Sequence, residues 1–330
     1  MIRMGWIGCG RHASQMLLPQ LGRNGIRIEA VCDIDADAAG RIASQYGVGS
    51  VYSEVADLVA HPGLDAVGMA VGPDLHRSAA LMALERGLPV FMEKPPAADE
   101  AGAEEVARAA EAAGKPVLLG FMKRYSTGNR IAKSVLEGDF GAVHGISGSY
   151  MTAPTYFAGE VDYTGFYLHH CVHYMDFIPW LGGAPFSEMS VRKVEPSPGR
   201  LLFHLGFTLT NGAIGTIQMG TLQSRGTPME FVQVMGDHKR IEINNIINVA
   251  YYRDPPFKAD DPAATLTSDA DTLTWTPNFT AAANEDFKGY SALVADVAKA
   301  LRGEPSAAPT AQDGLNAMRN LTRMIAALEA

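Results

Sequence analysis

The sequence predicts a two-domain protein, in which a doubly wound α/β domain is followed by an α+β domain with a mostly antiparallel sheet. In the first third of the chain, short unbroken apolar runs alternate with helical patterns, which is typical of parallel strands covered on both faces. After about Lys123, longer runs with period-2 alternation follow one another across tight turns, which indicates antiparallel strands. We place the domains at residues 1–122 and 123–330, with packing of the C-terminal helices back on the first domain as an alternative.

Composition excludes several classes of partner. The chain has 330 residues, more than one hydrophobic core usually serves, and 47% of them are apolar. The net charge is −9, with no basic face to bind nucleic acid or an anionic membrane. The three cysteines are too few for a disulfide framework and fit a reducing compartment. We therefore expect a small-molecule substrate and no resident metal.

The N-terminus runs directly into a glycine-rich turn. It lacks the charged region and the long apolar stretch of a secretory signal. No segment approaches the ~20 unbroken apolar residues that a membrane span needs. These features predict a soluble, cytoplasmic protein.

The first domain is expected to contain five strands and five helices. The strands are predicted at Ile2–Ile7, Ile28–Cys32, Ala66–Val71, Pro89–Met92 and Pro116–Phe121. The helices are predicted at Ala13–Leu21, Ala36–Tyr46, Glu54–Ala60, Leu75–Arg86 and Ala101–Ala113.

The second domain is expected to begin with a helix at Ser126–Glu137 and to contain a long apolar helix at about Gly165–Leu181. Its strands are predicted at Val143–Met151, Glu188–Val194, Leu201–Thr210, Ala213–Leu222, Met229–Met235 and Arg240–Asn244. Asn211-Gly212 is a strong hairpin signal. Asp254–Asn278 is rich in Pro, Asp and Thr and is predicted to be a long loop, before two closing helices at Tyr290–Arg302 and Thr310–Leu328.

The segment Gly8-Cys9-Gly10-Arg11-His12-Ala13 lies between the first predicted strand and the first predicted helix. In this position the first glycine allows a tight turn, the second lets the backbone approach a pyrophosphate, and the small third residue lets helix and strand pack closely. Asp33 ends the second strand, where an acidic residue binds the ribose hydroxyls of a dinucleotide. The alternative is a plain tight turn with a strand-end acid. Asp33 and Asp35 would repel a 2′-phosphate, so the sequence favours NAD over NADP.

The predicted strand Pro89–Met92 is followed directly by Glu93-Lys94-Pro95-Pro96. The carboxyl ends of strands in an open α/β sheet form the ligand crevice. A lysine there can hydrogen-bond a substrate hydroxyl and stabilise developing negative charge on its oxygen. Lys94–Pro95 is a candidate cis bond. The alternative for this segment is a solvated proline turn.

The glycine turn, the Asp65–Val71 strand with Gly72-Pro73-Asp74-Leu75-His76 after it, and Glu93-Lys94-Pro95 come in the order and spacing of the Gfo/Idh/MocA oxidoreductase family, which this chain resembles. Gly120–Tyr125 resembles that family's entry into its second domain. Tyr290–Glu304 resembles its closing helix.

The resemblance implies a Rossmann domain, a second domain with a large open sheet that mediates homo-oligomers, and Lys94 as the catalytic lysine. It also implies cofactor contacts from Gly8, Gly10, Arg11, His12, Ala13, Asp33, Val71, Pro73, His76, Glu93 and Lys94.

The predicted helix at Gly165–Leu181 carries His169, His173 and Asp176 at spacings that place them on one helical face. Three interpretations compete: His173 is a general acid/base, the three side chains hold a metal, or they are satisfied core residues. The resemblance favours the first. Family members commonly carry an Asp at the position of His169, so this departure leaves the substrate and the reaction type open.

We expect reversible oxidation of a secondary alcohol on a polyol, sugar or sugar acid, with His173 taking the proton and Lys94 holding the oxygen. Lys123, Arg124 and Tyr125 are candidates for binding the rest of the substrate, and the alternative for this segment is an ordinary basic turn. His169 is a candidate for substrate binding and for catalysis. A non-redox lyase or glycoside-cleaving enzyme that uses bound NAD transiently is the second hypothesis. A dinucleotide-sensing regulatory protein is the third.

Overall fold

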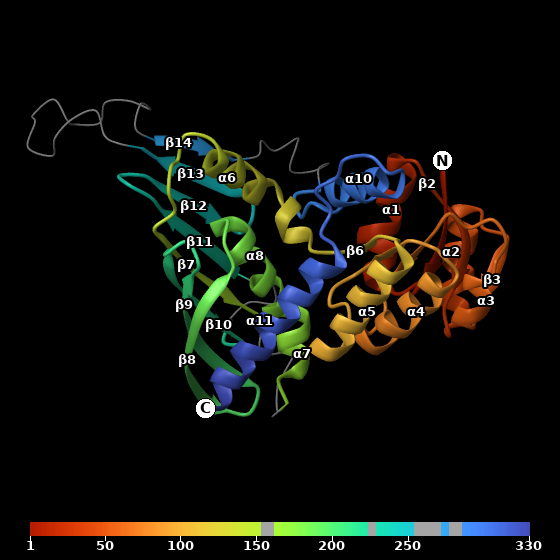
Figure 1. Cartoon of the computed structure of the whole chain (residues 1–330), viewed down its shortest axis with the longest axis horizontal. Coiled ribbons are helices and arrows are strands. Elements are labelled where there is room, and N and C mark those ends of the chain that lie inside the picture. The colour runs from red at the N-terminus through yellow and green to blue at the C-terminus, as the bar shows by residue number, and fades with distance from the viewer. Residues whose placement is uncertain (153–161, 224–228, 254–271, 277–285) are drawn as a thin grey trace, which may run out of the picture. The chain divides into compact units, whose positions relative to one another are not determined.

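The computed structural model describes residues 1–152, 162–223, 229–253, 272–276 and 286–330 (Figure 1). The chain divides into two compact units. Met1–Met122 and Gly289–Thr322 form unit 1, and Lys123–Lys288 and Arg323–Ala330 form unit 2.

Unit 1 is built on a six-stranded parallel sheet with the strand order β3-β2-β1-β4-β5-β6. The strands are β1 Ile2–Ile7, β2 Ile26–Cys32, β3 Ser50–Tyr52, β4 Ala66–Met69, β5 Val90–Met92 and β6 Val117–Leu119. The predicted parallel sheet is confirmed, although β3 was not predicted because three residues are too few for a periodic signal. The strand order reverses between β1 and β4, which is where ligands bind in folds of this kind.

Most helices of unit 1 lie between these strands in the chain, and two further helices come after the second unit. They are α1 Leu18–Leu21, α2 Ala36–Tyr46, α3 Val55–Val59, α4 Pro73–Glu85, α5 Glu100–Ala113 and, after the second unit, α10 Tyr290–Leu301 and the first part of α11 Ala311–Glu329. The Asp35 side chain caps α2 by accepting from the N–H groups of Asp37 and Ala38. The predicted helix Ala13–Leu21 exists, but it begins with a π-helical turn, η1 Ala13–Leu17, and continues as α1.

The core of unit 1 is apolar on both faces of its sheet, as parallel strands require. Every residue of β4 is buried, and so are Trp6 and Phe91, whose rings contact each other. Burying one such side chain contributes about 1.5–3 kcal/mol to folding. This rigid sheet fixes the carboxyl ends of β1, β4 and β5 relative to one another.

Unit 2 contains an eight-stranded sheet with the order β14-β13-β12-β11-β7-β10-β9-β8. The strands are β7 Gly145–Met151, β8 Phe186–Ser197, β9 Arg200–Leu209, β10 Ile214–Gly220, β11 Met229–Met235, β12 Arg240–Asn244, β13 Asn248–Tyr252 and β14 Thr272–Trp275. β7 and β10 are parallel and the other pairs are antiparallel, so the predicted sheet type is confirmed. The Asn211-Gly212 hairpin joins β9 to β10, with Gly212 at φ 88°.

Helices α6 Thr127–Glu137 and α8 Val172–Gly182 lie against one face of this sheet (Figure 1). The prediction of one continuous α-helix at Gly165–Leu181 was wrong. The segment is instead α7 Thr164–Phe166, a π-helical turn η5 Tyr167–Cys171, and then α8. A π turn has i→i+5 hydrogen bonds, so it shifts the angular phase of the residues that follow it.

The expectation of an unbroken loop at Asp254–Asn278 was wrong in one part. Thr272–Trp275 forms β14 and pairs with β13. Its threonines and tryptophan favour a strand, but the run is only four residues long and lies in a stretch rich in Pro and Asp. The rest of that range, apart from residue 276, lies outside the described residues. Among the helices in the described ranges, none combines the length and the apolar character that a bilayer crossing needs.

Candidate active site

The glycine turn follows β1 directly. Gly8 has φ 91°, and a Cβ at this position would lie 2.4 Å from the carbonyl oxygen of Ala70, so only glycine fits. A Cβ built on Gly10 would meet nothing within 4 Å. The Ser14 N–H donates to the Gly10 carbonyl at 3.0 Å, so a helix begins immediately after this turn. Arg11, His12 and Ala13 thus form the first helical turn, whose N–H groups have no partners within the helix itself.

Asp33 lies at the end of β2 and is tied to the glycine turn. Its Oδ2 accepts from the Cys9 N–H at 2.6 Å, and its Oδ1 accepts from the Asp35 N–H at 2.9 Å. Each carboxylate oxygen can accept a second hydrogen bond. The carboxylate is therefore held in one orientation and can still accept from a diol.

These residues fit a dinucleotide. The open space above Gly10 admits a pyrophosphate close to the backbone, and the first helical turn directs N–H groups and the positive end of the helix dipole toward it. Asp33 supplies the acceptors that ribose hydroxyls require. Gly8, Gly10, Arg11, His12, Ala13 and Asp33, all predicted as cofactor contacts, are thus brought together by the turn between β1 and its helix and by the end of β2.

Lys94 follows β5 on the same edge of the sheet, and the Lys94–Pro95 bond is cis, as predicted. The neighbouring Glu93 is buried, and its Oε1 lies 3.6 Å from His12 Nε2. Gly120, after β6, leaves room for this carboxylate, because a Cβ there would lie 2.5 Å from Glu93 Oε1. The parallel sheet therefore brings the Lys94 turn and the glycine turn to one edge of unit 1.

The segment after β4 supplies Val71, Pro73 and His76. Val71 and Pro73 are half-buried at the start of α4, whereas His76 is only 1% exposed. The His76 Nε2 accepts from the Val71 N–H at 3.1 Å, and its Nδ1 lies 2.8 Å from the Pro95 carbonyl oxygen. His76 is thus buried between two backbone segments that follow the carboxyl ends of β4 and β5.

In unit 2, the residues of the histidine helix differ in exposure. His169, in the π turn, is exposed, His173 is half-buried and Asp176 is buried. Asp176 forms a two-pronged ion pair with Arg124, with Arg124 Nε 2.9 Å from Asp176 Oδ2 and the Arg124 Nη2 donating to Oδ1. Such a pair fixes the guanidinium geometrically. Within the described part of the chain, no group of three or more His, Cys, Asp or Glu side chains is arranged to hold a metal.

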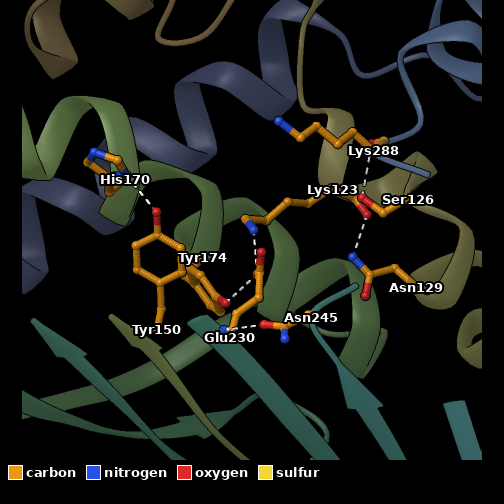
Figure 2. A network of polar contacts seen from close by, with 9 residues as sticks. All are labelled: Lys123, Ser126, Asn129, Tyr150, His170, Tyr174, Glu230, Asn245 and Lys288. Atoms are coloured by element: carbon orange, nitrogen blue, oxygen red, sulfur yellow. Dashed lines mark hydrogen bonds and ion pairs between the residues drawn. The ribbon is translucent and has the colours of Figure 1, made fainter. Parts of the chain in front are cut away.

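Lys123 heads a second polar cluster in unit 2 (Figure 2). Its Nζ lies 2.5 Å from Glu230 Oε2, and the Tyr174 hydroxyl donates to the same oxygen at 2.8 Å. The ammonium also lies over the rings of Tyr150 and Tyr174, at 5.4 and 5.3 Å. Burial, with Glu230 beside it, holds the pKa of Tyr174 well above its ordinary value, so the phenol stays a hydrogen-bond donor.

This cluster continues to the π turn, because the Tyr150 hydroxyl lies 2.6 Å from His170 Nδ1 (Figure 2). Glu230, Tyr174 and Tyr150 were not predicted from the sequence. One signal was available for Glu230: a buried lysine needs an acidic partner, and Glu230 is the acid on β11. Lys123 and Glu230 are 107 residues apart, so the sequence does not indicate which acid pairs with the lysine.

Comparison with known proteins agrees with this architecture. Residues 2–121 match the family model described as the oxidoreductase family's NAD-binding Rossmann fold. Residues 132–329 match the model described as that family's C-terminal alpha/beta domain.

The individual relatives have low sequence identity to this chain. The inositol 2-dehydrogenase of Corynebacterium glutamicum is 28% identical over 231 residues, which cover 66% of this chain and 66% of that protein, just under two thirds of its length. A dehydrogenase from Chromobacterium violaceum has a TM-score of 0.86 at 22% identity, covering 99% of this chain and 95% of that one. Levoglucosan dehydrogenase, solved with NADH and levoglucosan, has a TM-score of 0.84 at 15% identity, covering 99% and 97%. At these identities the structural likeness establishes the fold.

The two family models together span nearly the whole sequence, in the order that the two sheets follow along the chain. The chain therefore belongs to the Gfo/Idh/MocA oxidoreductase family, with that family's NAD-binding Rossmann domain followed by its C-terminal alpha/beta domain.

Proposed function

We propose that this protein reversibly oxidises a secondary alcohol of a polyol, sugar or sugar acid, with NAD as the hydride acceptor. The observation that carries the proposal is the position of Lys94, which follows β5 on the sheet edge that also holds the glycine turn. The names of the relatives support the substrate class, since one is an inositol 2-dehydrogenase and another was solved with levoglucosan.

The proposal divides the work between the two parts of the chain, with residues 1–122 for the dinucleotide and 123–330 for the substrate. When bound, NAD supplies a nicotinamide ring that accepts a hydride. Gly8, Gly10 and the first turn of the following helix bind the pyrophosphate, and Asp33 accepts from the ribose hydroxyls. Val71, Pro73 and Glu93 shape the surface on which the ring lies.

Lys94 and His173 act on the same substrate hydroxyl in this proposal. The Lys94 ammonium donates a hydrogen bond to the oxygen and stabilises the negative charge that grows on it. His173 takes the hydroxyl proton as the carbon–hydrogen bond breaks, so the products are a carbonyl compound, NADH and one proton held by the imidazole. In the reverse direction the same imidazole returns the proton.

The remaining substrate contacts are assigned to His169, Arg124 and Tyr125. His169 is exposed and can donate to a carboxylate or a carbonyl oxygen. Arg124 is held by Asp176, so it offers a cation of fixed orientation. A histidine at position 169, in place of the family's aspartate, can donate a hydrogen bond. It therefore fits a substrate with an acceptor oxygen beside it, such as a sugar acid.

A panel of inositols, polyols, aldoses and sugar acids tests the proposal, with NADH formation measured by absorbance. At least one member of the panel should reduce NAD in the presence of the wild-type protein. The alternative, a lyase or glycoside-cleaving enzyme that uses NAD transiently, is favoured by the departure at His169. It predicts product formation with no net NADH, which the same assay separates from dehydrogenation.

The proposal includes a homo-oligomer formed through the sheet of unit 2. Val194, Ile214, Met229 and Met235 are 46–64% exposed. Their register places them on one face. Gly145 pairs with both Ile214 and Met235, and Met151 pairs with Met229. Val194 pairs with Leu202, which is in register with Gly220 and so with Met151. Light scattering of the purified protein should give a multiple of 35.3 kDa, and Ile214→Glu should lower it; a wild-type monomer would contradict this part.

A further inference from the structure

His76, which the sequence predicts as a cofactor contact, is buried. It lies in the first turns of α4, where its backbone N–H donates to the Gly72 carbonyl at 2.9 Å, and its side chain is 1% exposed. A side chain so deeply buried presents little surface to a ligand. Its effect on the site must therefore pass through the groups that it contacts.

The two ring contacts define the state of the imidazole. The Val71 N–H can only donate, so His76 Nε2 must accept and carry no proton. The Pro95 carbonyl can only accept, so Nδ1 must carry the proton. The two partners thus select the neutral Nδ1–H tautomer, because a doubly protonated ring would direct an N–H at the Val71 N–H.

These partners belong to two different strands. Val71 lies beyond the end of β4, and Pro95 follows Lys94 beyond the end of β5. Pro95 and Pro96 have no N–H groups, so this turn has few donors with which to anchor itself. The Pro95 carbonyl is the group through which His76 fixes the turn, one residue from Lys94.

We propose that His76 is a positioning residue, a neutral imidazole that joins the Val71 segment to the Lys94–Pro95 turn and so sets the place of the Lys94 amine. The inference rests on the proposed function of Lys94 and adds a separate prediction for each ring nitrogen. The contact with Pro95 governs turnover through Lys94. The contact with Val71 governs the backbone segment beside the dinucleotide.

Two amide variants, each of which keeps one of the two contacts, separate their effects. In His76→Asn the side-chain amide nitrogen stands near the Nδ1 position and keeps the bond to Pro95, but the side chain is too short to reach Val71. In His76→Gln the amide oxygen stands near the Nε2 position and accepts from Val71, while the bond to Pro95 is lost. His76→Leu removes both contacts, and thermal unfolding of all three variants reports on their stability.

We expect opposite effects in the two variants. His76→Gln should lower kcat about 100-fold, the effect of misplacing a reacting group by about 1 Å, with the Kd for NADH close to that of the wild type. His76→Asn should keep kcat and weaken NADH binding about fivefold, as loss of one hydrogen bond of about 1 kcal/mol does. Equal losses in both variants, or losses that follow the melting temperature, would show that His76 merely supports the fold and would overturn the proposal.

A measurement without substrate or cofactor completes the test. In ¹⁵N NMR of the apo protein, the His76 signals, identified by their absence from His76→Asn, should show a protonated Nδ1 and an unprotonated Nε2. The opposite tautomer, or a doubly protonated ring, would contradict the inference. If no alcohol in the panel is oxidised, the proposed function fails, and the NADH affinities and the NMR tautomer still decide the role of His76.

Discussion

The carboxylate of Asp33 accepts a hydrogen bond from the backbone N–H of Cys9 at 2.6 Å, which ties the end of β2 to the glycine turn after β1. The residue proposed to bind the ribose and the loop proposed to bind the pyrophosphate are therefore one rigid unit. A site held in this way loses little conformational entropy when a ligand binds.

The charge of Asp33 should set the preference between the two nicotinamide cofactors. Asp33→Asn removes a negative charge and weakens the acceptor for a ribose diol, so the ratio of NADH to NADPH affinity should fall about tenfold, as expected for a hydrogen bond to a charged group. Asp35→Asn, in which asparagine still caps α2 and only a charge is lost, should lower this ratio less than Asp33→Asn, because it leaves the acceptor for the diol in place. An unchanged ratio in Asp33→Asn, measured by fluorescence titration, would remove Asp33 from cofactor selection.

The two glycines of the turn should respond differently to alanine. Gly8→Ala places a methyl group 2.4 Å from a carbonyl oxygen at φ 91°, so it should destabilise unit 1 and lower its melting temperature. Gly10→Ala meets nothing within 4 Å and should leave the melting temperature unchanged. It should nevertheless weaken NADH binding, since the methyl group fills the space proposed for the pyrophosphate. Full NADH affinity in Gly10→Ala would place the pyrophosphate elsewhere.

The ion pair of Lys123 and Glu230 should be a main determinant of the stability of unit 2. The side chains are 7% and 15% exposed, so Glu230→Gln leaves a nearly buried ammonium without its counter-charge and should lower the free energy of unfolding by about 3–5 kcal/mol. The double variant Glu230→Gln, Lys123→Met should regain part of the lost free energy of unfolding, because it no longer buries an unpaired ammonium. Arg108→Gln, which breaks an exposed pair, should change stability by less than about 0.5 kcal/mol. Similar losses for both pairs in urea unfolding would contradict this account.

The three cysteines should be inert in the folded protein. Burial, reinforced by the Asp33 charge, raises the pKa of Cys9 to about 12 and that of Cys32 to about 11, and burial holds the pKa of Cys171 well above its ordinary value. Iodoacetamide reacts with thiolates, so at neutral pH it should label none of them until the protein is denatured.

The same shifts fix the direction of the alkaline pH dependence. Above pH 9.0, the ordinary thiol value, the unfolded chain loses protons that the folded chain keeps, so the stability present below that pH falls as pH rises. Cys9→Ala should reduce this fall. For the labelling prediction, rapid reaction of the native protein with iodoacetamide near neutral pH would show that the thiols are accessible and would contradict the prediction of inert cysteines.

Much of unit 1 could be predicted because its signals are local. Gly8, Gly10 and Asp33 lie within one βαβ segment, and β4 is a short unbroken apolar run bounded by turn residues. Such features depend on backbone sterics and on burial of a strand on both faces, and neighbouring residues report both. The same holds for the Asn211-Gly212 hairpin, which needs a positive φ at the turn.

What the sequence did not reveal depends on contacts between distant segments. β14 is a run of only four strand-favouring residues in a Pro- and Asp-rich stretch, and it pairs with β13, which is about 20 residues earlier in the chain. The π turn at Tyr167–Cys171 changes the phase of the histidine helix, and spacing rules for an α-helix do not anticipate it. The contacts of His76 and Lys123 join residues from separate elements, so the residue types were visible but their partners were not.

In the proposed reaction, Lys94 and His173 carry out the chemistry while other residues hold the cofactor. The most direct test is single-turnover NADH formation with the best substrate of the panel, compared in wild type, Lys94→Ala and His173→Ala, with NADH affinity measured on the same samples. We expect each variant to lose about 100- to 1000-fold in rate, as removal of one transition-state donor or proton acceptor does, with NADH affinity retained. A variant with near wild-type rate would contradict the role given to that residue, and loss of NADH binding in parallel with the rate would contradict the division of labour.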